Sequence, residues 1–166
     1  MKTLLLMRHA KSSWKNTDLA DHERPLKKKG RKDTVLMAKQ LKKKDLIPDL
    51  IYSSSAIRAT ETLEILLDSL KFDGKAKVKD VLYMAEPDTI IDKINSVNDD
   101  IDKLLIIGHN PGLESLTQIL GDKIDALPTG AIAVIVLPIN KWSELNAETE
   151  GELANLWTPA EFRKKD

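Results

Sequence analysis

Short apolar segments alternate with amphipathic ones along this chain, and the alternation restricts the fold that it can adopt. Apolar runs rich in Leu, Ile and Val, each shorter than a typical buried helix, occur at 3–7, 50–52, 104–107 and 131–137. Such runs are typical of strands that are covered on both faces. Strands and helices in alternation predict an α/β protein, here a three-layer α/β/α sandwich with a mostly parallel central sheet.

Four amphipathic segments between these runs are predicted to be helices, because apolar residues recur in them every three or four positions. They cover 26–44, 57–70, 88–97 and 113–120. Ala76 and Val78 alternate with lysines, which indicates a half-exposed strand with a possible extension to Leu82, and a last strand is indicated at 153–157. No linker interrupts the pattern, so residues 1–166 are predicted to form a single domain.

The balance of charge and the absence of cysteine exclude several classes of function. Twenty-six Lys and Arg residues match twenty-six Asp and Glu residues, which gives the whole molecule no reason to bind nucleic acid or a membrane. The runs 27–29 and 42–44 are all lysine and are interpreted as solvated helix faces. A chain without cysteine has no disulfide or thiolate chemistry, and it fits a reducing compartment. The apolar start is too short for a signal peptide, so a cytoplasmic protein is predicted.

Basic side chains follow three of the predicted strands at the point where each strand ends. Arg8 and His9 follow the first strand, Arg58 comes shortly after the second, and His109 follows the strand at 104–107. Each has a structural explanation when taken alone, but ligands of α/β proteins bind beyond the carboxyl ends of the strands. Four groups of this kind without a nearby acid are costly to bring together unless an anion fills the site. Phosphate is the natural candidate, because Arg offers two donors to its oxygens.

The motifs that carry these residues resemble those of a known family. The segment 4–10, LLLMRHA, is similar to the opening of the histidine phosphatase superfamily, with Ala10 where many members have Gly. SSSAIRATET at 53–62 resembles its second phosphate-binding segment, and GHNPG at 108–112 resembles the segment of its second histidine. The resemblance runs from about Lys2 to Leu137, and three motifs in this order and spacing are a specific signal.

One branch of that superfamily is particularly similar to this chain. The strings RHAKSSW at 8–14 and RPL at 24–26 resemble the small SixA-like phosphohistidine phosphatases. The resemblance implies a phosphoglycerate mutase-like fold without a large cap insertion. It also implies an enzyme that needs neither a metal nor another cofactor. Ala10 does not argue against activity, because Ala still permits close backbone approach when its φ is negative.

The resemblance also assigns roles to the residues at the strand ends. His9 would be the nucleophile, attacking phosphorus to form a phosphohistidine that water then hydrolyses. Arg8, Arg58 and His109 would bind the phosphoryl oxygens and stabilise the transition state. The protonation state of His109 is left open.

The remaining polar candidates are less clearly indicated. Glu86 or Asp21 is the possible general acid, although a phosphohistidine substrate has a leaving group that needs little help from an acid. Asp21 and Arg24 are candidate substrate contacts. His22, in a polar loop, is interpreted as a surface residue. Trp14 either forms a wall at the mouth of the pocket or packs on the first helix, and packing is the preferred interpretation.

The short connections favour a phosphorylated protein as the partner, because an open, shallow site suits a phosphohistidine that another protein presents. A small phosphate ester handled by the same pocket is the alternative, which would make the chain a phosphomonoesterase. A non-catalytic module that binds phosphate or another oxyanion is the second alternative. A metal site of His9, His22 and His109 is weakly indicated, because arginines rather than carboxylates accompany the histidines. Thr129 lies where it could reach the pocket.

Overall fold

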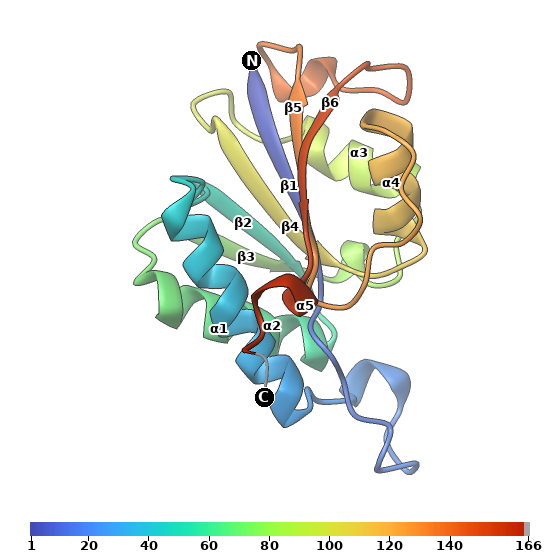
Figure 1. The fold of residues 1–166 in the computed structure, drawn as a ribbon. Helices are drawn as coiled ribbons and strands as arrows, with labels where there is room; N and C mark the ends of the chain where they lie inside the picture. Colours follow the sequence, from blue (N-terminus) through green and yellow to red (C-terminus); the bar gives the residue numbers. More distant parts are fainter. Residues whose placement is uncertain (165–166) are drawn as a thin grey trace.

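A six-stranded sheet forms the centre of the molecule, with the strand order β3-β2-β4-β1-β5-β6 (Figure 1). The structure is a computed structural model and describes residues 1–164. The strands are β1 (Lys2–Arg8), β2 (Leu50–Ser54), β3 (Lys75–Lys79), β4 (Lys103–Gly108), β5 (Ile132–Leu137) and β6 (Glu152–Trp157). The first four are parallel, and β5 pairs antiparallel with both β1 and β6. The prediction of a mostly parallel sheet is confirmed.

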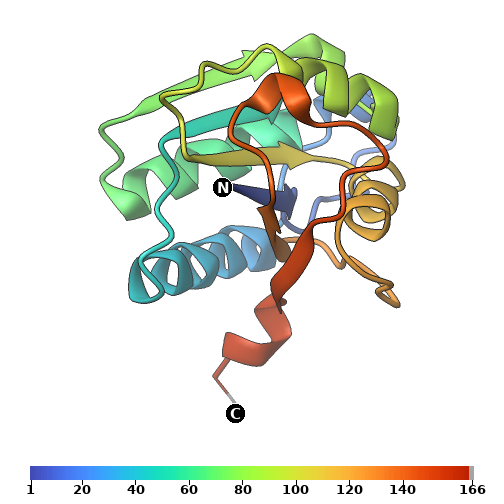
Figure 2. The same ribbon diagram turned by 90° about the horizontal axis from the view of Figure 1, so that it is seen from above.

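Helices cover both faces of this sheet, which confirms the three-layer arrangement (Figures 1 and 2). The helices α1 (Lys28–Lys43) and α2 (Ile57–Leu70) lie on one face, and α3 (Pro87–Asn95) and α4 (Gly112–Leu120) lie on the other. A short helix, α5 (Pro159–Phe162), follows β6. Single 3-10 turns are η1 (Asp21–Glu23), η2 (Asp80–Leu82) and η3 (Trp142–Glu144). The strand β3 ends at Lys79 and passes into η2, so it does not extend to Leu82.

The central strand β1 is buried on both faces, as its apolar sequence predicts. Leu4 and Leu6 belong to the core under α3 and α4, whereas Leu5 and Met7 belong to the core under α1 and α2. All four side chains are 0% exposed. Burial of a side chain of this size stabilises the fold by about 1.5–3 kcal/mol. The backbone at the end of β1 is therefore held firmly in place.

Strand register brings the three predicted motifs to one edge of the sheet. Arg8 at the end of β1 pairs with Gly108 at the end of β4, and Ser53 of β2 pairs with Ile107 of β4. The residues after these strands therefore emerge side by side. This is the carboxyl edge of the parallel strands, where the sequence predicts a site.

The segment from 138 to 164, which the sequence left largely open, completes the sheet. Trp142 is fully buried, and its Nε1 donates a hydrogen bond to the carbonyl of Ile101 (2.7 Å). β6 adds an edge strand beside β5, and Arg163 then donates to both carboxylate oxygens of buried Asp33 on α1. The end of the described chain is thereby tied to the first helix. None of the helices in residues 1–164 combines the length and apolar character needed to cross a membrane.

The start of α1 packs unusually closely on the segment that follows β1. A Cβ atom added at Gly30 would overlap the backbone carbonyl of Lys11. The amide of Lys27 donates to the same carbonyl (2.9 Å). The backbones of the helix and the loop touch at residue 30, so only glycine fits there without displacement. This contact fixes the path of the chain beyond His9.

We expect Gly30→Ala to lower the free energy of unfolding by about 1–3 kcal/mol, because the added methyl group forces two backbones apart. Helix propensity by itself would act in the opposite direction, by about 1 kcal/mol. Urea denaturation of wild type and variant measures the difference. Lys39→Ala, at an exposed position on the same helix, is the control and should change stability by no more than about 0.5 kcal/mol. A Gly30→Ala protein more stable than wild type would contradict the close contact.

Candidate functional site

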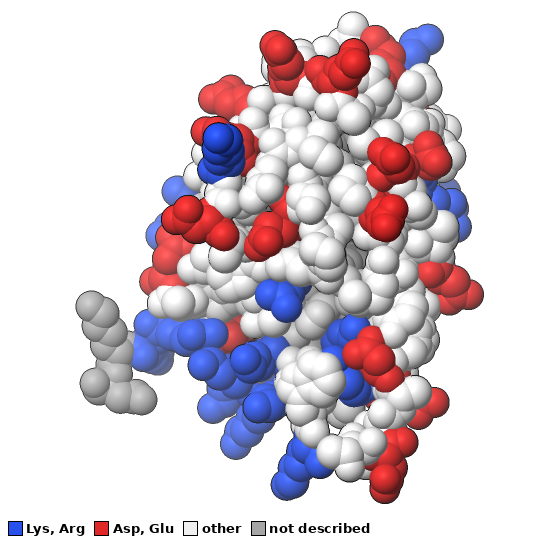
Figure 3. Space-filling view, turned by 90° about the vertical axis from the view of Figure 1, so that its right-hand side faces the viewer, with Lys and Arg blue, Asp and Glu red and all other residues white. Residues whose placement is uncertain are grey.

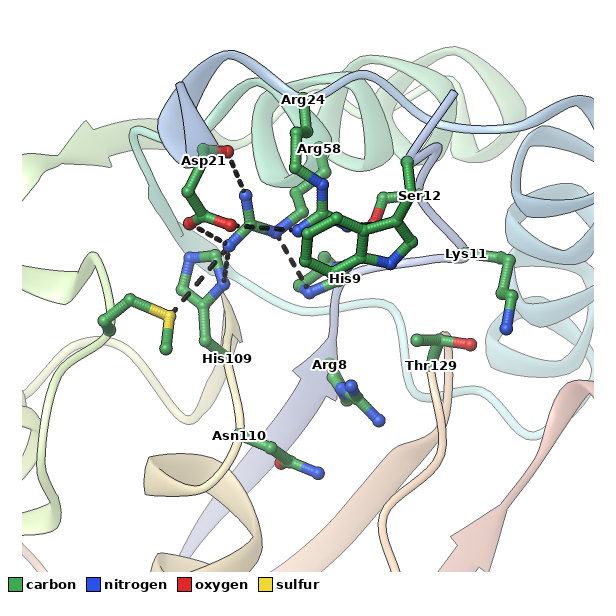
Figure 4. A pocket seen from close by; sticks show the side chains of 12 residues that line it. Arg8, His9, Lys11, Ser12, Asp21, Arg24, Arg58, His109, Asn110 and Thr129 are labelled. Atoms are coloured by element: carbon green, nitrogen blue, oxygen red, sulfur yellow. Dashed lines mark hydrogen bonds and ion pairs between the residues drawn. The ribbon is translucent and has the colours of Figure 1, made fainter. Parts of the chain in front are cut away.

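A cavity of about 280 Å³ opens at the carboxyl ends of β1, β2 and β4 (Figure 4). It is lined by Arg8, His9, Lys11, Ser12, Trp14, Asp21, Arg24, Arg58, Met84, His109, Asn110 and Thr129. Six of the seven site residues predicted from the sequence are among them. The seventh, Glu86, is exposed at the N-cap of α3 and lines a neighbouring hollow instead.

A hydrogen bond from the His9 ring to the backbone of the next residue orients the imidazole. Its Nδ1 lies 2.8 Å from the carbonyl oxygen of Ala10, which can only accept, so Nδ1 carries the proton. Its Nε2 receives a hydrogen bond from Nε–H of Arg58 (3.3 Å) and therefore presents a lone pair. The imidazole is 6% exposed. The fold thus presents an unprotonated, oriented Nε2 to the cavity.

His109 faces His9 across the cavity, with ring centroids 5.1 Å apart. Its Nε2 lies 2.7 Å from Oγ of Ser54, and its Nδ1 lies 3.4 Å from Nη2 of Arg58. Since a guanidinium can only donate, Nδ1 is the acceptor and Nε2 carries the proton toward Ser54. Ser54 is fully buried at the end of β2, so the second strand holds the second histidine.

Both histidines are neutral in this environment. Burial lowers the pKa of His9 to about 3, and the nearby His109, Arg58 and Arg8 act in the same direction. Burial also lowers the pKa of His109 to about 4, with Arg58 as the next cause. A neutral imidazole keeps the lone pair that a nucleophile needs, and cationic neighbours help to keep it neutral.

Two arginines project into the cavity from different elements. Arg58, in the first turn of α2, is 3% exposed although no acidic residue accompanies it in that turn. Arg8 donates from Nη1 to the carbonyl of Leu127 (3.2 Å), whereas its buried Nε has no partner among the described residues. Burial lowers the pKa of the Arg8 guanidinium. Because both guanidinium groups line the cavity that also holds His9, their charge favours an anionic ligand there.

Asp21 supplies negative charge beside the arginines of the cavity. Its carboxylate accepts from Arg24 Nη1 (2.9 Å), from Arg58 Nη2 (2.9 Å) and from the hydroxyl of Tyr83. Its backbone carbonyl also accepts from Nη1 of Arg58 (2.7 Å). The bond from Tyr83, with the two arginines, holds the pKa of the Asp21 carboxyl well below its usual range. Asp21 is therefore an ionised hydrogen-bond acceptor that holds Arg58 in position, and it is not suited to act as a general acid.

The structure corrects one interpretation from the sequence and adds detail to another. Trp14 does not pack on α1: its side chain is 71% exposed at the rim of the cavity, with the Arg24 guanidinium 3.3 Å from the ring centroid. His22 is partly buried rather than a free surface residue, with Nε2 2.9 Å from Oγ of Ser55. The ring of Tyr83 packs edge-on against that of His22 (centroids 4.8 Å apart).

Sequence reasoning missed three contributors to the site: Tyr83, Met84 and Ser54 as the partner of His109. Tyr83 and Met84 follow η2, and the Sδ atom of Met84 lies 3.9 Å from Arg58 Nη2. The segment with Tyr83 and Met84 can approach the start of α4 because residue 112 is a glycine: a Cβ atom there would overlap the carbonyl of Ala85. The motif at 108–112 contains this glycine, but nothing in the sequence indicates that the segment after η2 is what it contacts. In residues 1–164, no group of three or more His, Asp or Glu side chains is arranged to hold a metal ion.

The chain is similar to several known proteins in sequence and in structure. A family model described as histidine phosphatase superfamily (branch 1) matches residues 4–82. An uncharacterised protein of Mycobacterium tuberculosis is 34% identical over 140 residues, which are 78% of this chain and 85% of the relative. Among solved structures, the protein histidine phosphatase SixA in complex with tungstate has a TM-score of 0.82 at 24% identity, covering 97% of this chain and 99% of that one. SixA from Agrobacterium tumefaciens has a TM-score of 0.82 at 22% identity, covering 95% and 98%.

The two buried histidines should make the protein lose stability in mild acid. Their folded-state pKa values of about 3 and about 4 lie below the ordinary value of 6.5. Above that value both states are neutral, but at lower pH the unfolded chain takes up protons that the folded chain cannot. We expect His9→Gln to abolish about 2 kcal/mol of the stability loss between pH 7 and pH 5, as measured by urea denaturation at each pH.

Asp21→Asn is the control for this measurement. The lowered pKa of Asp21 stabilises the folded state at every pH above the value of an unfolded carboxyl, and this contribution is lost only at lower pH. Asp21→Asn should therefore lower stability by the same amount at pH 7 and pH 5. If wild type and His9→Gln lost the same free energy of unfolding between pH 7 and pH 5, His9 would not be held neutral in the folded state.

Proposed function

This chain belongs to the histidine phosphatase superfamily, and we propose that it is a phosphatase that removes a phosphoryl group from phosphohistidine on a protein, through a covalent intermediate on His9. One observation carries the proposal: the Ala10 carbonyl holds Nδ1–H of His9, so that Nε2 faces Arg58 as an unprotonated nucleophile. Arg8, Arg58 and His109 surround the place where a phosphoryl group would lie.

In the first step, Nε2 of His9 attacks phosphorus while the bond from phosphorus to the leaving group breaks. The imidazole becomes positively charged, and the hydrogen bond to the Ala10 carbonyl stabilises that charge without moving the ring. Arg58 Nε gives up its contact with Nε2 and donates to a phosphoryl oxygen instead. The guanidinium of Arg8, which also lines the cavity, provides further donors for the transition state.

In the second step, water attacks phosphorus, the bond from phosphorus to Nε2 breaks, and inorganic phosphate is released. The phosphoryl group brings negative charge next to His109, which favours protonation of its Nδ1. Protonated Nδ1 would donate to a phosphoryl oxygen in place of accepting from Arg58. The bond from Nε2 to Ser54 keeps the ring in position throughout.

The carboxylates favour a substrate with a good leaving group. Glu86 lies outside the cavity, and Asp21 is ionised and bound by two arginines and Tyr83. Neither is suited to protonate an alkoxide. The imidazole released from phosphohistidine leaves more readily, so a site without a strong general acid fits a phosphoramidate better than an alkyl phosphate.

The form of the cavity supports a protein as the carrier of the phosphoryl group. The connections around it are short, and its volume of about 280 Å³ is small for a site that encloses a whole metabolite. We propose a single domain, without a large cap insertion, that acts in the cytoplasm on a phosphorylated protein. We also propose that it acts without a metal, because the arginines beside His9 would repel a cation.

The test is phosphate release from a histidine-phosphorylated protein and from N-phosphoimidazole. We expect release by wild type, a loss of roughly a thousandfold or more in His9→Ala and His9→Asn, and no effect of EDTA. Rapid quenching with labelled substrate should leave acid-labile label on wild type and none on His9→Asn. Release that survives the loss of His9 would contradict its role as nucleophile, and inhibition by EDTA would contradict metal independence.

Two further outcomes would redirect the proposal. Comparable rates on small sugar phosphates and on phosphohistidine protein would favour a small-molecule phosphomonoesterase. Binding of phosphate without release from any phosphorylated compound would favour a non-catalytic module.

Asp21→Asn should lower kcat/KM by the same factor, roughly tenfold, on substrates with good and poor leaving groups, because Asp21 positions Arg58 and transfers no proton. Comparing p-nitrophenyl phosphate with phenyl phosphate measures this directly. Tyr83→Phe, which removes one hydrogen bond but keeps the carboxylate charge, should cause a smaller loss. A loss confined to phenyl phosphate would instead identify Asp21 as the general acid.

A further inference from the structure

Basic residues are concentrated on one side of the cavity, although the chain as a whole has no net charge. Residues 8–32 contain nine Lys and Arg against three Asp and Glu, whereas the full chain has twenty-six of each. In Figure 3, Lys and Arg gather at the lower left of the face shown, and the upper part carries mostly separate Asp and Glu. An approaching partner therefore meets a strongly uneven field around the cavity.

The start of α1 contradicts the usual preference of helix termini. Lys27 is its N-cap, Lys28 and Lys29 are its first residues, and its first turn has no acidic residue and no side-chain cap. Cations at a helix N-terminus cost about 0.3–1 kcal/mol each. All three lysines are exposed. Among residues 1–164, no side-chain hydrogen bond or ion pair of these lysines offsets that cost. An uncompensated cost of this kind is expected where a surface serves a function.

Trp14 is a second feature that the fold itself does not explain. Its side chain is 71% exposed at the rim of the cavity, although most of its area is apolar. The Arg24 guanidinium, fixed by Asp21 and by the carbonyl of Ser13, stacks on one side of the ring. Tryptophan and arginine are the residue types that protein interfaces favour and that contribute most to binding there.

The lysines and Trp14 form one continuous surface. Lys11 lines the cavity, Lys27 donates its amide to the carbonyl of Lys11 (2.9 Å), and Ser12 pairs with Leu26 as an isolated bridge. The segment that carries Trp14 therefore lies directly beside the start of α1. The resulting basic platform consists of Lys11, Trp14, Lys15, Lys27 and Lys28.

We propose that the basic platform docks an acidic surface of the phosphorylated protein, next to the phosphohistidine that enters the cavity. The inference rests on the proposed function and names the partner surface: carboxylates facing the lysines and an apolar or planar group on Trp14. A nucleic acid fits less well, because one aromatic ring provides no series of stacking positions for successive bases. The segment 15–27 that carries part of the platform also contains Asp18, Asp21 and Glu23. Exposed charges of this kind raise the association rate and lose their effect as salt increases.

The test compares phosphohistidine peptides that differ only in the residues flanking the phosphohistidine: glutamate, glutamine or lysine. We expect kcat/KM at low salt to be roughly tenfold higher for the glutamate peptide than for the glutamine peptide, and lower still for the lysine peptide. The differences should shrink at salt well above physiological concentration. N-phosphoimidazole, which has no flanking residues, reports the chemistry alone.

Reversing the charge of the platform lysines tests whether they cause the preference for the glutamate peptide. The triple variant Lys15→Glu, Lys27→Glu, Lys28→Glu should abolish or invert the preference for the glutamate peptide and leave N-phosphoimidazole hydrolysis unchanged. Acidic residues at 27 and 28 suit the helix N-terminus, so folding is preserved. The matched control is Lys42→Glu, Lys43→Glu, Lys44→Glu at the other end of α1, which should keep the preference. A preference that survives the first variant, or equal rates on the three peptides, would overturn the proposal.

Binding separates the docking inference from the proposed chemistry. His9→Ala with the unphosphorylated peptides should bind the glutamate peptide most tightly, and Trp14→Ala should weaken that binding. The binding preference is expected even if the protein hydrolyses no phosphoramidate, N-phosphoimidazole included. That outcome would reject the proposed function but not the docking surface. Equal binding of the three peptides would overturn the platform. Tighter binding of a single-stranded oligonucleotide than of a glutamate peptide of the same charge would also overturn it, in favour of nucleic acid.

Discussion

The site depends on the immobility of β1. Its side chains enter the cores on both faces of the sheet, and its backbone pairs with β4 on one side and β5 on the other. A strand held from four directions cannot shift without breaking several of these contacts together. Arg8 is the last residue of β1 and His9 follows it directly, so their backbone is fixed before any ligand arrives. The bond from His9 to the carbonyl of Ala10 then fixes the ring as well.

Placing two arginines and two histidines at one sheet edge creates an electrostatic problem, which the fold solves in two ways. Burial next to arginine keeps both imidazoles neutral, so that only the guanidinium groups carry charge. Asp21 then balances Arg24 and Arg58 from the side. The same two arrangements leave the nucleophile unprotonated and Arg58 oriented. Structural stability in the absence of a ligand and readiness for phosphoryl transfer thus arise from the same contacts.

The segment between β1 and α1 contributes more to this molecule than its irregular structure suggests. It carries Asp21 and Arg24 into the cavity, places Trp14 at the rim and is fastened to α1 by the contact at Gly30. Its inner side therefore serves the chemistry, and its outer side forms the basic platform. A single loop in this way connects the reacting group to the surface that a partner would meet.

The sequence by itself determined the three-layer fold, the six strands and four longer helices to within about three residues at each end, and the segments after the strands that carry Arg8, His9, Arg58 and His109. It did not indicate α5 or the three 3-10 turns. These features rest on local patterns: apolar periodicity, strand length and short motifs. Only the tertiary structure decided that Asp21 is an ionised counter-charge, that Glu86 lies outside the cavity, that Ser54 holds His109 and that Trp14 is exposed. Each of these depends on which loops meet across the sheet edge, and loop contacts between distant segments leave no period in the sequence.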